Sequence, residues 1–329
     1  MEIEAAVHAL RDGELVAFPT ETVYGLGANA QDVNALRKIF AVKGRPTTHP
    51  LIVHLDSQRF LHRWASDVPE TAQRLAERFW PGPLTLVLPR AANVSDLVTG
   101  GQKTVAIRVP SHPMAQQLLT AFGGGIAAPS ANRYGHLSPT RAEHVREELG
   151  DAVKIVLDGG ESQIGLESTI VSCEGPVVRL LRPGAVTAAQ MRQVVGAALT
   201  GPGVEAPRVP GSTPSHYAPE TPMTLVPGGE IDARAAEVSR DGRRIAVLAQ
   251  QLPLKSHEYV TWINAGRRPT QYAHDLYANL RALDSAGCEQ ILVQDVPADE
   301  RWEAIRDRLT RAAAKIAEDD DTGALAVLP

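Results

Sequence analysis

Short apolar runs alternate with amphipathic stretches through the first 190 residues. The runs have the length of strands and stop at glycine, proline or polar residues, as buried strands do. Strands are expected on this basis at 14–18, 51–55, 84–88, 105–109, 126–128, 155–157, 168–172 and 177–181. Helical spacing of apolar positions predicts helices near 5–11, 32–43, 69–80, 112–122 and 140–149. This pattern predicts one α/β domain with many strands.

A segment without periodicity follows, between about 198 and 223. It holds six prolines and three glycines, a composition typical of linkers. The alternation then resumes, with strands expected at 224–226, 245–249, 259–263 and 291–293 and helices at 231–239, 270–286 and 299–317. Such alternation predicts a small parallel three-layer domain. We therefore expect a first domain at 1–200, a linker at 201–223 and a second domain at 224–329.

The composition is that of a globular chain. Hydrophobic residues make up 43% and charged residues 22% of the 329 positions, close to the average for soluble domains. The longest apolar runs, such as 84–88, fall far short of the roughly 20 residues that a membrane helix needs. Glu2 and Glu4 stand where a secretory signal would carry basic residues. We expect no membrane span, no export signal and a cytoplasmic location.

The cysteine count and the net charge argue against disulfide-rich, zinc-binding and nucleic-acid-binding proteins. Cys173 and Cys288 are far apart, which fits neither a disulfide framework nor a zinc-binding set. Both are expected to be small packed hydrophobic residues. The net charge of −5 does not indicate a broad electrostatic surface for nucleic acid. Any link to RNA is therefore expected to be indirect.

Two familiar phosphate-binding motifs are incomplete. The stretch 100–104 (GGQKT) is similar to the end of a Walker A loop, but Gln102 replaces the glycine before the lysine. Gly25 and Gly27 begin a dinucleotide fingerprint, but Ala30 stands in the place of the third glycine. We interpret both stretches as turns. The sequence also lacks the zinc-protease and nucleophile-elbow motifs, which removes the commoner hydrolase interpretations.

Polar groups concentrate instead around the first predicted strand. Residues 19–27 (PTETVYGLG) follow that strand, and Lys43 and Arg45 flank a glycine soon afterwards. A guanidinium fork and a lysine point charge at this spacing can bind one polyphosphate. Solvated surface charges are the simpler alternative.

Further polar residues occur inside or after extended stretches. Arg108 lies in the apolar stretch 104–110 (TVAIRVP), and a strand-buried arginine needs a partner. That partner is either a structural carboxylate or the carboxylate of a ligand. Residues 127–132 (AAPSAN), 167–171 (ESTIV) and 179–184 (RLLRPG) add hydroxyls and a further arginine. Small residues there would let a ligand approach the backbone.

Taken together, these segments resemble the YrdC-like family. The motifs PTETVYGLG, KGRP, TVAIRVP, APSAN, ESTIV and LLRPG occur in the family's order across nearly all of residues 1–190. In the linker, 215–219 (SHYAP) is similar to the Ser-x-His-Tyr-x-Pro motif of the family's long form, although Ser215 directly precedes the histidine. The resemblance implies a twisted open α/β sheet with a concave positive cavity, followed by a smaller Rossmann-like domain.

The same resemblance implies a reaction. L-threonine, bicarbonate and ATP would give threonylcarbamoyl-AMP and pyrophosphate, a nucleotidyl transfer with Mg²⁺ as cofactor. A separate tRNA threonylcarbamoyl transferase complex would then modify the adenosine beside the anticodon. The resemblance leaves direct tRNA binding by this chain open.

Site residues follow from the motifs that match. The resemblance implies a threonine site made of Thr22, His54, Arg108, Ala128 and Ser168, with Arg108 on the carboxylate. It implies an ATP site made of Arg45, His49, Thr104, Ser130, Ser138, Arg182 and Tyr217. Lys43, Arg45, Ser130 and Asn132 would carry catalysis, and Tyr217 would be part of a lid. Mg²⁺ would be held through the ATP phosphates and not by direct protein ligands. Whether His49 and His54 face the cavity or the core stays open.

Three alternatives remain at this point. A YrdC-like concavity could bind RNA without chemistry, which the net charge disfavours. The larger hydrogenase-maturation enzymes that contain such a domain transfer carbamoyl groups, but they carry zinc-binding cysteines that this chain lacks. The C-terminal domain could also be a regulatory or docking domain for a second ligand.

Overall fold

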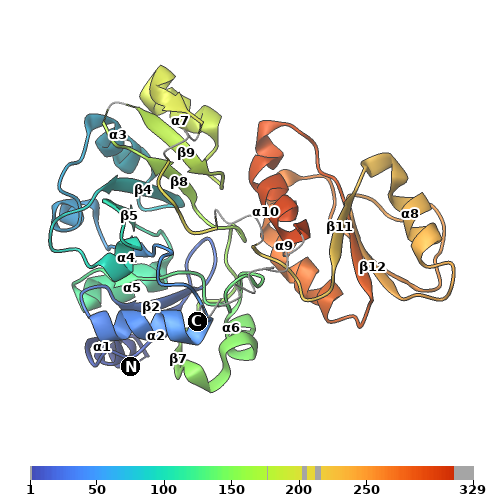
Figure 1. Cartoon of the computed structure of the whole chain (residues 1–329), viewed down its shortest axis with the longest axis horizontal. Helices are drawn as coiled ribbons and strands as arrows, with labels where there is room; N and C mark the ends of the chain where they lie inside the picture. Colours follow the sequence, from blue (N-terminus) through green and yellow to red (C-terminus); the bar gives the residue numbers. More distant parts are fainter. Residues whose placement is uncertain (1, 176, 202–205, 212–215, 315–329) are drawn as a thin grey trace, which may run out of the picture.

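The chain folds into two bodies, each built around its own sheet (Figure 1). The computed structural model describes residues 2–175, 177–201, 206–211 and 216–314. The N-terminal body contains a ten-stranded sheet and the C-terminal body a four-stranded sheet. Within the described ranges, no helix has the length and apolar character needed to cross a bilayer.

The N-terminal sheet is mixed and runs in the order β10-β9-β8-β4-β5-β3-β6-β2-β1-β7. Its strands are β1 (Val16–Phe18), β2 (Gly25–Asn29), β3 (Ile52–His54), β4 (Leu84–Pro89), β5 (Thr104–Arg108), β6 (Ile126–Ala127), β7 (Ile155–Val156), β8 (Thr169–Ser172), β9 (Val178–Arg182) and β10 (Leu199–Thr200). The central strand β5 pairs in parallel with β3 and antiparallel with β4. The predicted α/β domain with many strands is confirmed.

Helices cover the two faces of this sheet unequally. They are α1 (Glu2–Arg11), α2 (Val33–Lys43), α3 (Glu70–Phe79), α4 (Asp96–Thr99), α5 (Pro113–Phe122), α6 (Ala142–Leu149) and α7 (Ala188–Val195). One face packs against α2, α3 and α7. On the other face, α1 and α5 pack around Phe18 at the β1-β2-β6 end. Farther along that face, Ile52, Ala106 and Ile170 pack against the linker residue Val209 instead. This part of the sheet is therefore covered by loops.

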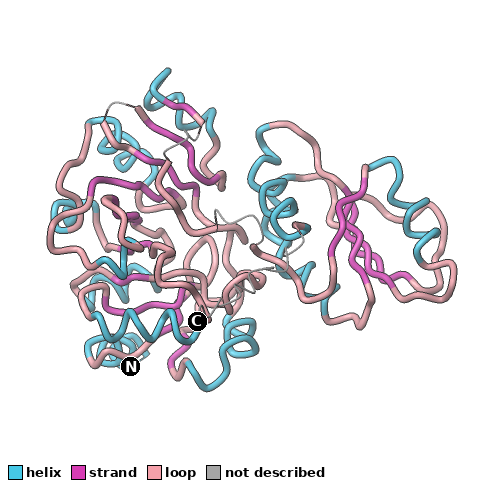
Figure 2. The backbone as a smooth tube through the Cα atoms, in the orientation of Figure 1, coloured by secondary structure: helices cyan, strands magenta, loops and turns pink. Residues whose placement is uncertain are grey.

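The C-terminal body is a parallel three-layer domain, as predicted. Its strands are β11 (Met223–Val226), β12 (Ile245–Ala249), β13 (Val260–Asn264) and β14 (Gln290–Gln294), in the spatial order β11-β14-β12-β13. All pairs are parallel. Helix α8 (Ile231–Val238) packs on one face, and α9 (Pro269–Asp284) and α10 (Glu303–Ala313) pack on the other. Figure 1 shows α9 and α10 on the side toward the N-terminal body, and Figure 2 shows loops between the two bodies.

Some elements differ from the sequence-based expectation. The stretch around Gly25 and Gly27 is strand β2, whereas a turn was expected. A side chain at Gly27 would come within 2.8 Å of both Phe18 and Ile126, so this glycine serves close packing between strands. Helix α7 and strand β10 were not predicted. The helix expected at 299–317 begins as a 3₁₀ turn at 300–302 and continues as α10, and residues 315–317 lie outside the described part.

Candidate functional site

A small cavity lies on the part of the N-terminal sheet that loops cover. Its volume is about 50 Å³, which is room for a few water molecules. The lining comes from β3, β5, β9 and the segments that follow β1 and β6, together with residues of the linker. Strands far apart in the sequence meet here because β3 pairs with β5 and places His54 beside Arg108.

All five residues of the predicted threonine set line this cavity: Thr22, His54, Arg108, Ala128 and Ser168. The two hydroxyls among them are held by neighbours. Thr22 accepts a hydrogen bond from Arg108, and Ser168 pairs with the hydroxyl of Thr85 at 2.8 Å. The structure thus brings the set together, and its role toward threonine stays a prediction.

Arg108 is fixed by three neighbours at once. Its Nη1 donates to Thr22 Oγ1 at 2.8 Å, and its Nε donates to the carbonyl of Gly82 at 3.3 Å. Its Nη2 lies 2.7 Å from Oε1 of Glu21, and both side chains are buried. The structural carboxylate, one of the two partners considered for this arginine, is therefore present. Because a guanidinium carries five N–H groups, these contacts leave two for a ligand.

His54 is a neutral group in this cavity. Its ring lies edge-on to Phe18, with centroids 6.0 Å apart, and Nδ1 is 3.2 Å from the carbonyl of Ile52. Burial, with the nearby charge of Arg108, lowers the pKa of His54 to about 3. An imidazole without charge can donate or accept hydrogen bonds to a ligand, but it adds nothing to the positive potential.

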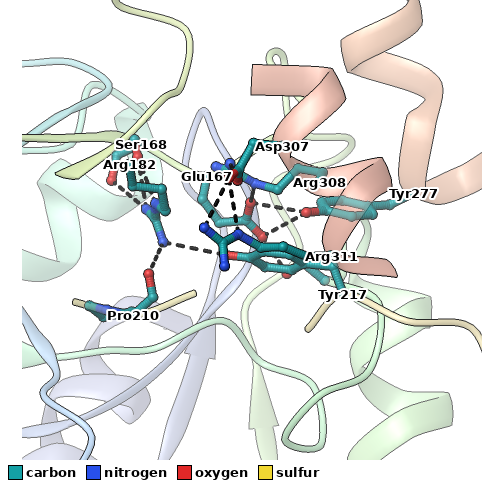
Figure 3. Close-up of polar contacts among 10 residues, drawn as sticks. Glu167, Ser168, Arg182, Pro210, Tyr217, Tyr277, Asp307, Arg308 and Arg311 are labelled. Atoms are coloured by element: carbon teal, nitrogen blue, oxygen red, sulfur yellow. Dashed lines mark hydrogen bonds and ion pairs between the residues drawn. The ribbon is translucent and has the colours of Figure 1, made fainter. Parts of the chain in front are cut away.

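Four residues of the predicted nucleotide set line the same cavity: Arg45, Ser130, Arg182 and Tyr217. Arg182 donates to the carbonyl of Ser168 at 2.8 Å and to that of Pro210 at 2.9 Å, and its Nη1 is 3.5 Å from the Tyr217 hydroxyl (Figure 3). Arg45 donates to the carbonyl of Pro50 at 3.0 Å. Burial lowers the pKa of Arg45 to about 10 and also lowers that of Arg182.

These two arginines lack the kind of partner that Arg108 has. In the part of the chain that the structure describes, neither Arg45 nor Arg182 forms an ion pair with a carboxylate within 4.0 Å. Carbonyl oxygens satisfy some of their N–H groups without neutralising their charge. A buried cation of this kind gains more from an incoming anion than a paired one does.

Lys43 does not line the cavity, although it was expected to face a polyphosphate together with Arg45. Its ammonium is buried and donates to the carbonyls of Ser130 and Asn132. Burial and the charge of Arg45 hold the pKa of Lys43 well below its usual range. In this structure the lysine therefore braces the Ser130–Asn132 segment.

The other members of the nucleotide set also lie away from the lining. Ser138 is buried and donates to Glu167 at 2.5 Å. Asn132 donates to the carbonyls of Arg133 and His136. His49 contacts the Tyr134 hydroxyl at 3.3 Å, and Thr104 begins β5, the strand that Arg108 ends. None of these four side chains lines the cavity.

Glu167 connects this site to the C-terminal body (Figure 3). Its carboxylate accepts hydrogen bonds from the Tyr277 hydroxyl of α9 at 3.0 Å and from Arg308 Nε of α10 at 2.8 Å. Arg308 is 1% exposed and also stacks over the Tyr217 ring, 5.2 Å from its centroid. Although burial opposes ionisation, Arg308, Arg182 and Ser138 hold the pKa of Glu167 below its usual value. The carboxylate is therefore ionised and shared across the domain boundary.

The linker forms the roof of the cavity through Pro210, Gly211, His216 and Tyr217. Tyr217 is buried and has φ of 60°, a left-handed conformation that costs a non-glycine residue about 1–2 kcal/mol. The rings of His216 and Tyr217 are 4.2 Å apart, and burial among Arg45, Lys43 and Arg182 holds the pKa of His216 well below its usual value. Ser215 of the linker motif lies outside the described residues.

Three charged residues of this arrangement were missed by sequence reasoning. Glu21 and Glu167 stand inside the motifs PTETVYGLG and ESTIV, so an unpaired arginine in a strand was a signal to search those motifs for its carboxylate. Arg308 lies 141 residues from Glu167. Its neighbours in the sequence give no sign of a role, since an arginine on a charged helix is ordinarily solvated.

Comparisons with known proteins cover almost the whole chain. Residues 8–184 match the family model of Sua5, YciO and YrdC, described as "Telomere recombination", and residues 186–314 match "Threonylcarbamoyl-AMP synthase, C-terminal domain". The threonylcarbamoyl-AMP synthase of Pyrococcus abyssi is 40% identical over 324 residues, covering 95% of this chain and 94% of the relative. That of Bacillus subtilis is 42% identical over 323 residues, covering 95% and 93%. The crystal structure of P. abyssi Sua5 complexed with L-threonine has a TM-score of 0.86 at 38% identity and covers 94% of each chain.

Proposed function

The chain belongs to the threonylcarbamoyl-AMP synthase family in its long, two-domain form, and from that premise we propose that it condenses L-threonine, bicarbonate and ATP into threonylcarbamoyl-AMP and pyrophosphate. The family resemblance that the six motifs indicated is thereby confirmed. The activity is that of an enzyme that makes an adenylate, and we assign it to the nucleotidyltransferases.

The main support for this proposal is that, among the described residues, one arginine of the cavity is paired with a carboxylate, whereas two others are not. At one end, Arg108 is paired with Glu21 and keeps two free N–H groups, which suits the single carboxylate of an amino acid. At the other end, Arg45 and Arg182 lack carboxylate partners among the described residues, which suits a polyphosphate. A site that joins an amino acid to a nucleotide needs both ends within a few ångströms of each other.

The chemistry that we propose needs positioning more than a reactive side chain. The threonine nitrogen attacks the carbon of bicarbonate, water leaves, and a carbamate forms. A carbamate oxygen then attacks the α-phosphorus of ATP, and the bond to pyrophosphate breaks. Repulsion among these anions and the charge on the departing pyrophosphate are offset by Arg45 and Arg182, with Lys43 bracing the backbone behind them. No covalent enzyme intermediate is required.

Mg²⁺ would assist by neutralising the phosphates of ATP. The described residues contain no group of three or more His, Cys, Asp or Glu side chains that could hold a metal ion. Oδ1 of Asn132 is nevertheless buried without a hydrogen-bond partner among them. Mg²⁺ usually keeps several waters and takes few protein ligands. The residues present therefore suit a metal that arrives with ATP. Ser130 lines the cavity and would hold the metal or its waters, and Asn132 would do so only after its side chain turns toward the cavity.

The linker residues above the cavity have a consequence for substrate entry. A cavity of about 50 Å³ is far too small for ATP, so His216 and Tyr217 must move aside before the nucleotide binds. After binding, the same residues would exclude water from the carbamate and the mixed anhydride, which hydrolyse readily. The left-handed backbone of Tyr217 favours such movement because leaving it relieves strain.

The product of this reaction is an intermediate for tRNA modification. We propose that the chain works in the cytoplasm and supplies the adenylate to a separate transferase complex. A net charge of −5 gives little general attraction for tRNA. We therefore propose that the chain synthesises the intermediate and does not itself bind tRNA.

The test is pyrophosphate release from ATP by the purified chain with Mg²⁺, with threonine or bicarbonate omitted in turn. Release should require both, and rapid trapping followed by mass spectrometry should detect threonylcarbamoyl-AMP. Serine in place of threonine is the matched control, since it retains every reacting group. ATP that stays intact, or release that ignores threonine, would refute the proposal.

A further inference from the structure

Glu21 is a buried carboxylate that the proposed reaction does not use. It lies in the segment between β1 and β2 and is 2% exposed. It does not itself line the cavity, whereas its neighbours Thr20 and Thr22 do. A carboxylate in such a position costs free energy unless its contacts repay the loss of water.

Glu21 contacts Arg108 on the side away from the cavity and restricts its movement. Oε1 lies 2.7 Å from Arg108 Nη2, and Oε2 accepts a hydrogen bond from the backbone N–H of Ser111 at 3.1 Å. The main-chain carbonyl of Glu21 accepts one from the N–H of Ile164 at 2.8 Å. Arg108 and Ser111 therefore hold the carboxylate while Ile164 holds the backbone of the same residue, and Arg108 cannot turn without breaking its ion pair.

A second effect concerns charge. Glu21 neutralises much of the positive charge of Arg108, while Arg45 and Arg182 keep theirs. A phosphate chain with several negative charges is attracted to the unpaired end much more strongly than to a neutral pair. A single carboxylate can still bind the two N–H groups of Arg108 that remain free.

We propose that Glu21 is a positioning residue that fixes Arg108 for the carboxylate of threonine and, by neutralising it, directs phosphate groups to the Arg45 and Arg182 end. The inference rests on the proposed function. It adds to that function the reason why two substrates that are both anionic bind in one orientation.

The test uses calorimetric titration of the full chain with threonine and, separately, with ATP. Glu21→Gln should raise the Kd for threonine at least tenfold and leave the Kd for ATP within threefold. Glutamine can accept from either Arg108 or Ser111 but not from both. Glu21→Asp keeps the charge and should give an intermediate loss. Glu14→Gln is the matched control, because Glu14 is an exposed residue with an ion pair of the same 2.7 Å length, to Lys38.

A competition experiment separates positioning from simple structural damage. Pyrophosphate should displace ATP but not threonine from the wild-type chain, and in Glu21→Gln it should displace threonine as well. If Glu21→Gln does not fold, Glu21→Asp alone should show a threonine Kd raised at least threefold with the ATP Kd unchanged. An unchanged threonine Kd, or equal losses for both ligands, would overturn the role of Glu21. Failure of the wild-type chain to bind threonine would overturn the proposed function too.

Discussion

Arg108 and Arg182 line the same cavity, and both are buried, yet the protein holds them in different ways. Arg108 is fixed within the N-terminal body by Glu21, Thr22 and a backbone carbonyl. Arg182 donates to two carbonyls, to the Ser168 hydroxyl at 3.2 Å and to a linker tyrosine. Glu167, a carboxylate that lines the same cavity, is bound instead by Arg308 of the C-terminal body. One end of the site is complete in a single domain, and the other depends on two.

The difference shows how burial prepares each arginine for its ligand. A neutral ion pair is tolerated without substrate, because its two charges compensate each other. Unpaired cations lose water without that compensation, and the lowered pKa values of Arg45 and Arg182 reflect the loss. Bound phosphates would restore the balance. Polyphosphates and changes in the C-terminal body should therefore alter binding at the nucleotide end much more than they alter threonine binding.

The largest effect is expected from breaking the buried pair between Glu167 and Arg308. Among the described residues, Arg308→Met leaves the carboxylate with Ser138 and Tyr277 as its hydrogen-bond donors, which should lower the free energy of unfolding by about 3–5 kcal/mol. Urea unfolding measures the loss. The double variant with Glu167→Gln should recover part of it, because no uncompensated charge remains buried.

The same variant tests whether the two ends are independent. Threonine affinity should change less than ATP affinity, since Arg308 reaches Tyr217 and Glu167 but none of the three groups that hold Arg108. Arg306→Met is the control on the same helix, where the side chain makes an exposed contact with the Pro297 carbonyl. An equal loss of both affinities would show that the threonine end also depends on the C-terminal body.

The next effect concerns Arg182 itself. Arg182→Gln should lower kcat/KM for ATP by about 10²–10³-fold, the range for removing one preorganised donor from developing charge. Pyrophosphate release measures the rate, and the threonine Kd should rise by a smaller factor, since Arg182 also donates to Ser168 of the threonine set. Arg179→Gln, on the same strand β9, is the matched control. Activity retained within threefold in Arg182→Gln would move the phosphate site elsewhere.

Much of the fold was predictable because apolar periodicity reports burial. The strand cores of β4, β5, β8, β12 and β14 follow directly from short apolar runs. Strand β2 could not be predicted in this way, because glycines are typical of turns. Only the structure shows that Gly27 is needed for close packing against Phe18. Strand β10 has two residues, which is too short to produce a periodic signal.

Which residues lie near the cavity was easier to predict than the directions in which their side chains point. Nine of the residues taken from the motifs line one cavity, and their roles toward the substrates stay predictions. The residue types alone did not predict that Lys43 and Ser138 point away from the cavity. Lys43 donates to a backbone carbonyl, and Ser138 donates to Glu167. The contact of Arg308 with Glu167 spans 141 residues and arises only when the two bodies pack together.

A smaller effect is expected from the roof of the nucleotide end. Tyr217→Ala should lower the yield of adenylate about tenfold and lower ATP consumption much less, because water then reaches the mixed anhydride. Pyrophosphate release measures the ATP consumed, and mass spectrometry of threonylcarbamoyl-AMP measures the adenylate that survives. Tyr259→Ala is the control, with a side chain that is 43% exposed on the C-terminal body. Equal losses in both yields would remove the lid role of Tyr217.

The smallest effect concerns His54 at the threonine end. Its pKa of about 3 in the folded chain lies below the ordinary value near 6.5 in the unfolded chain. Between these values the unfolded chain binds more protons, so the contribution of His54 to stability is full above pH 6.5 and is lost as the pH falls. The expected loss between pH 7.5 and pH 6.0 is about 0.8 kcal/mol. Urea unfolding of the wild type and of His54→Asn across this range measures it, and the difference between the two should shrink by that amount as the pH falls. A constant difference would mean that His54 has the same pKa in the folded and the unfolded chain. A difference that grows as the pH falls would mean that the folded chain favours the protonated ring, and the threonine end would then carry a positive charge that Glu21 does not balance.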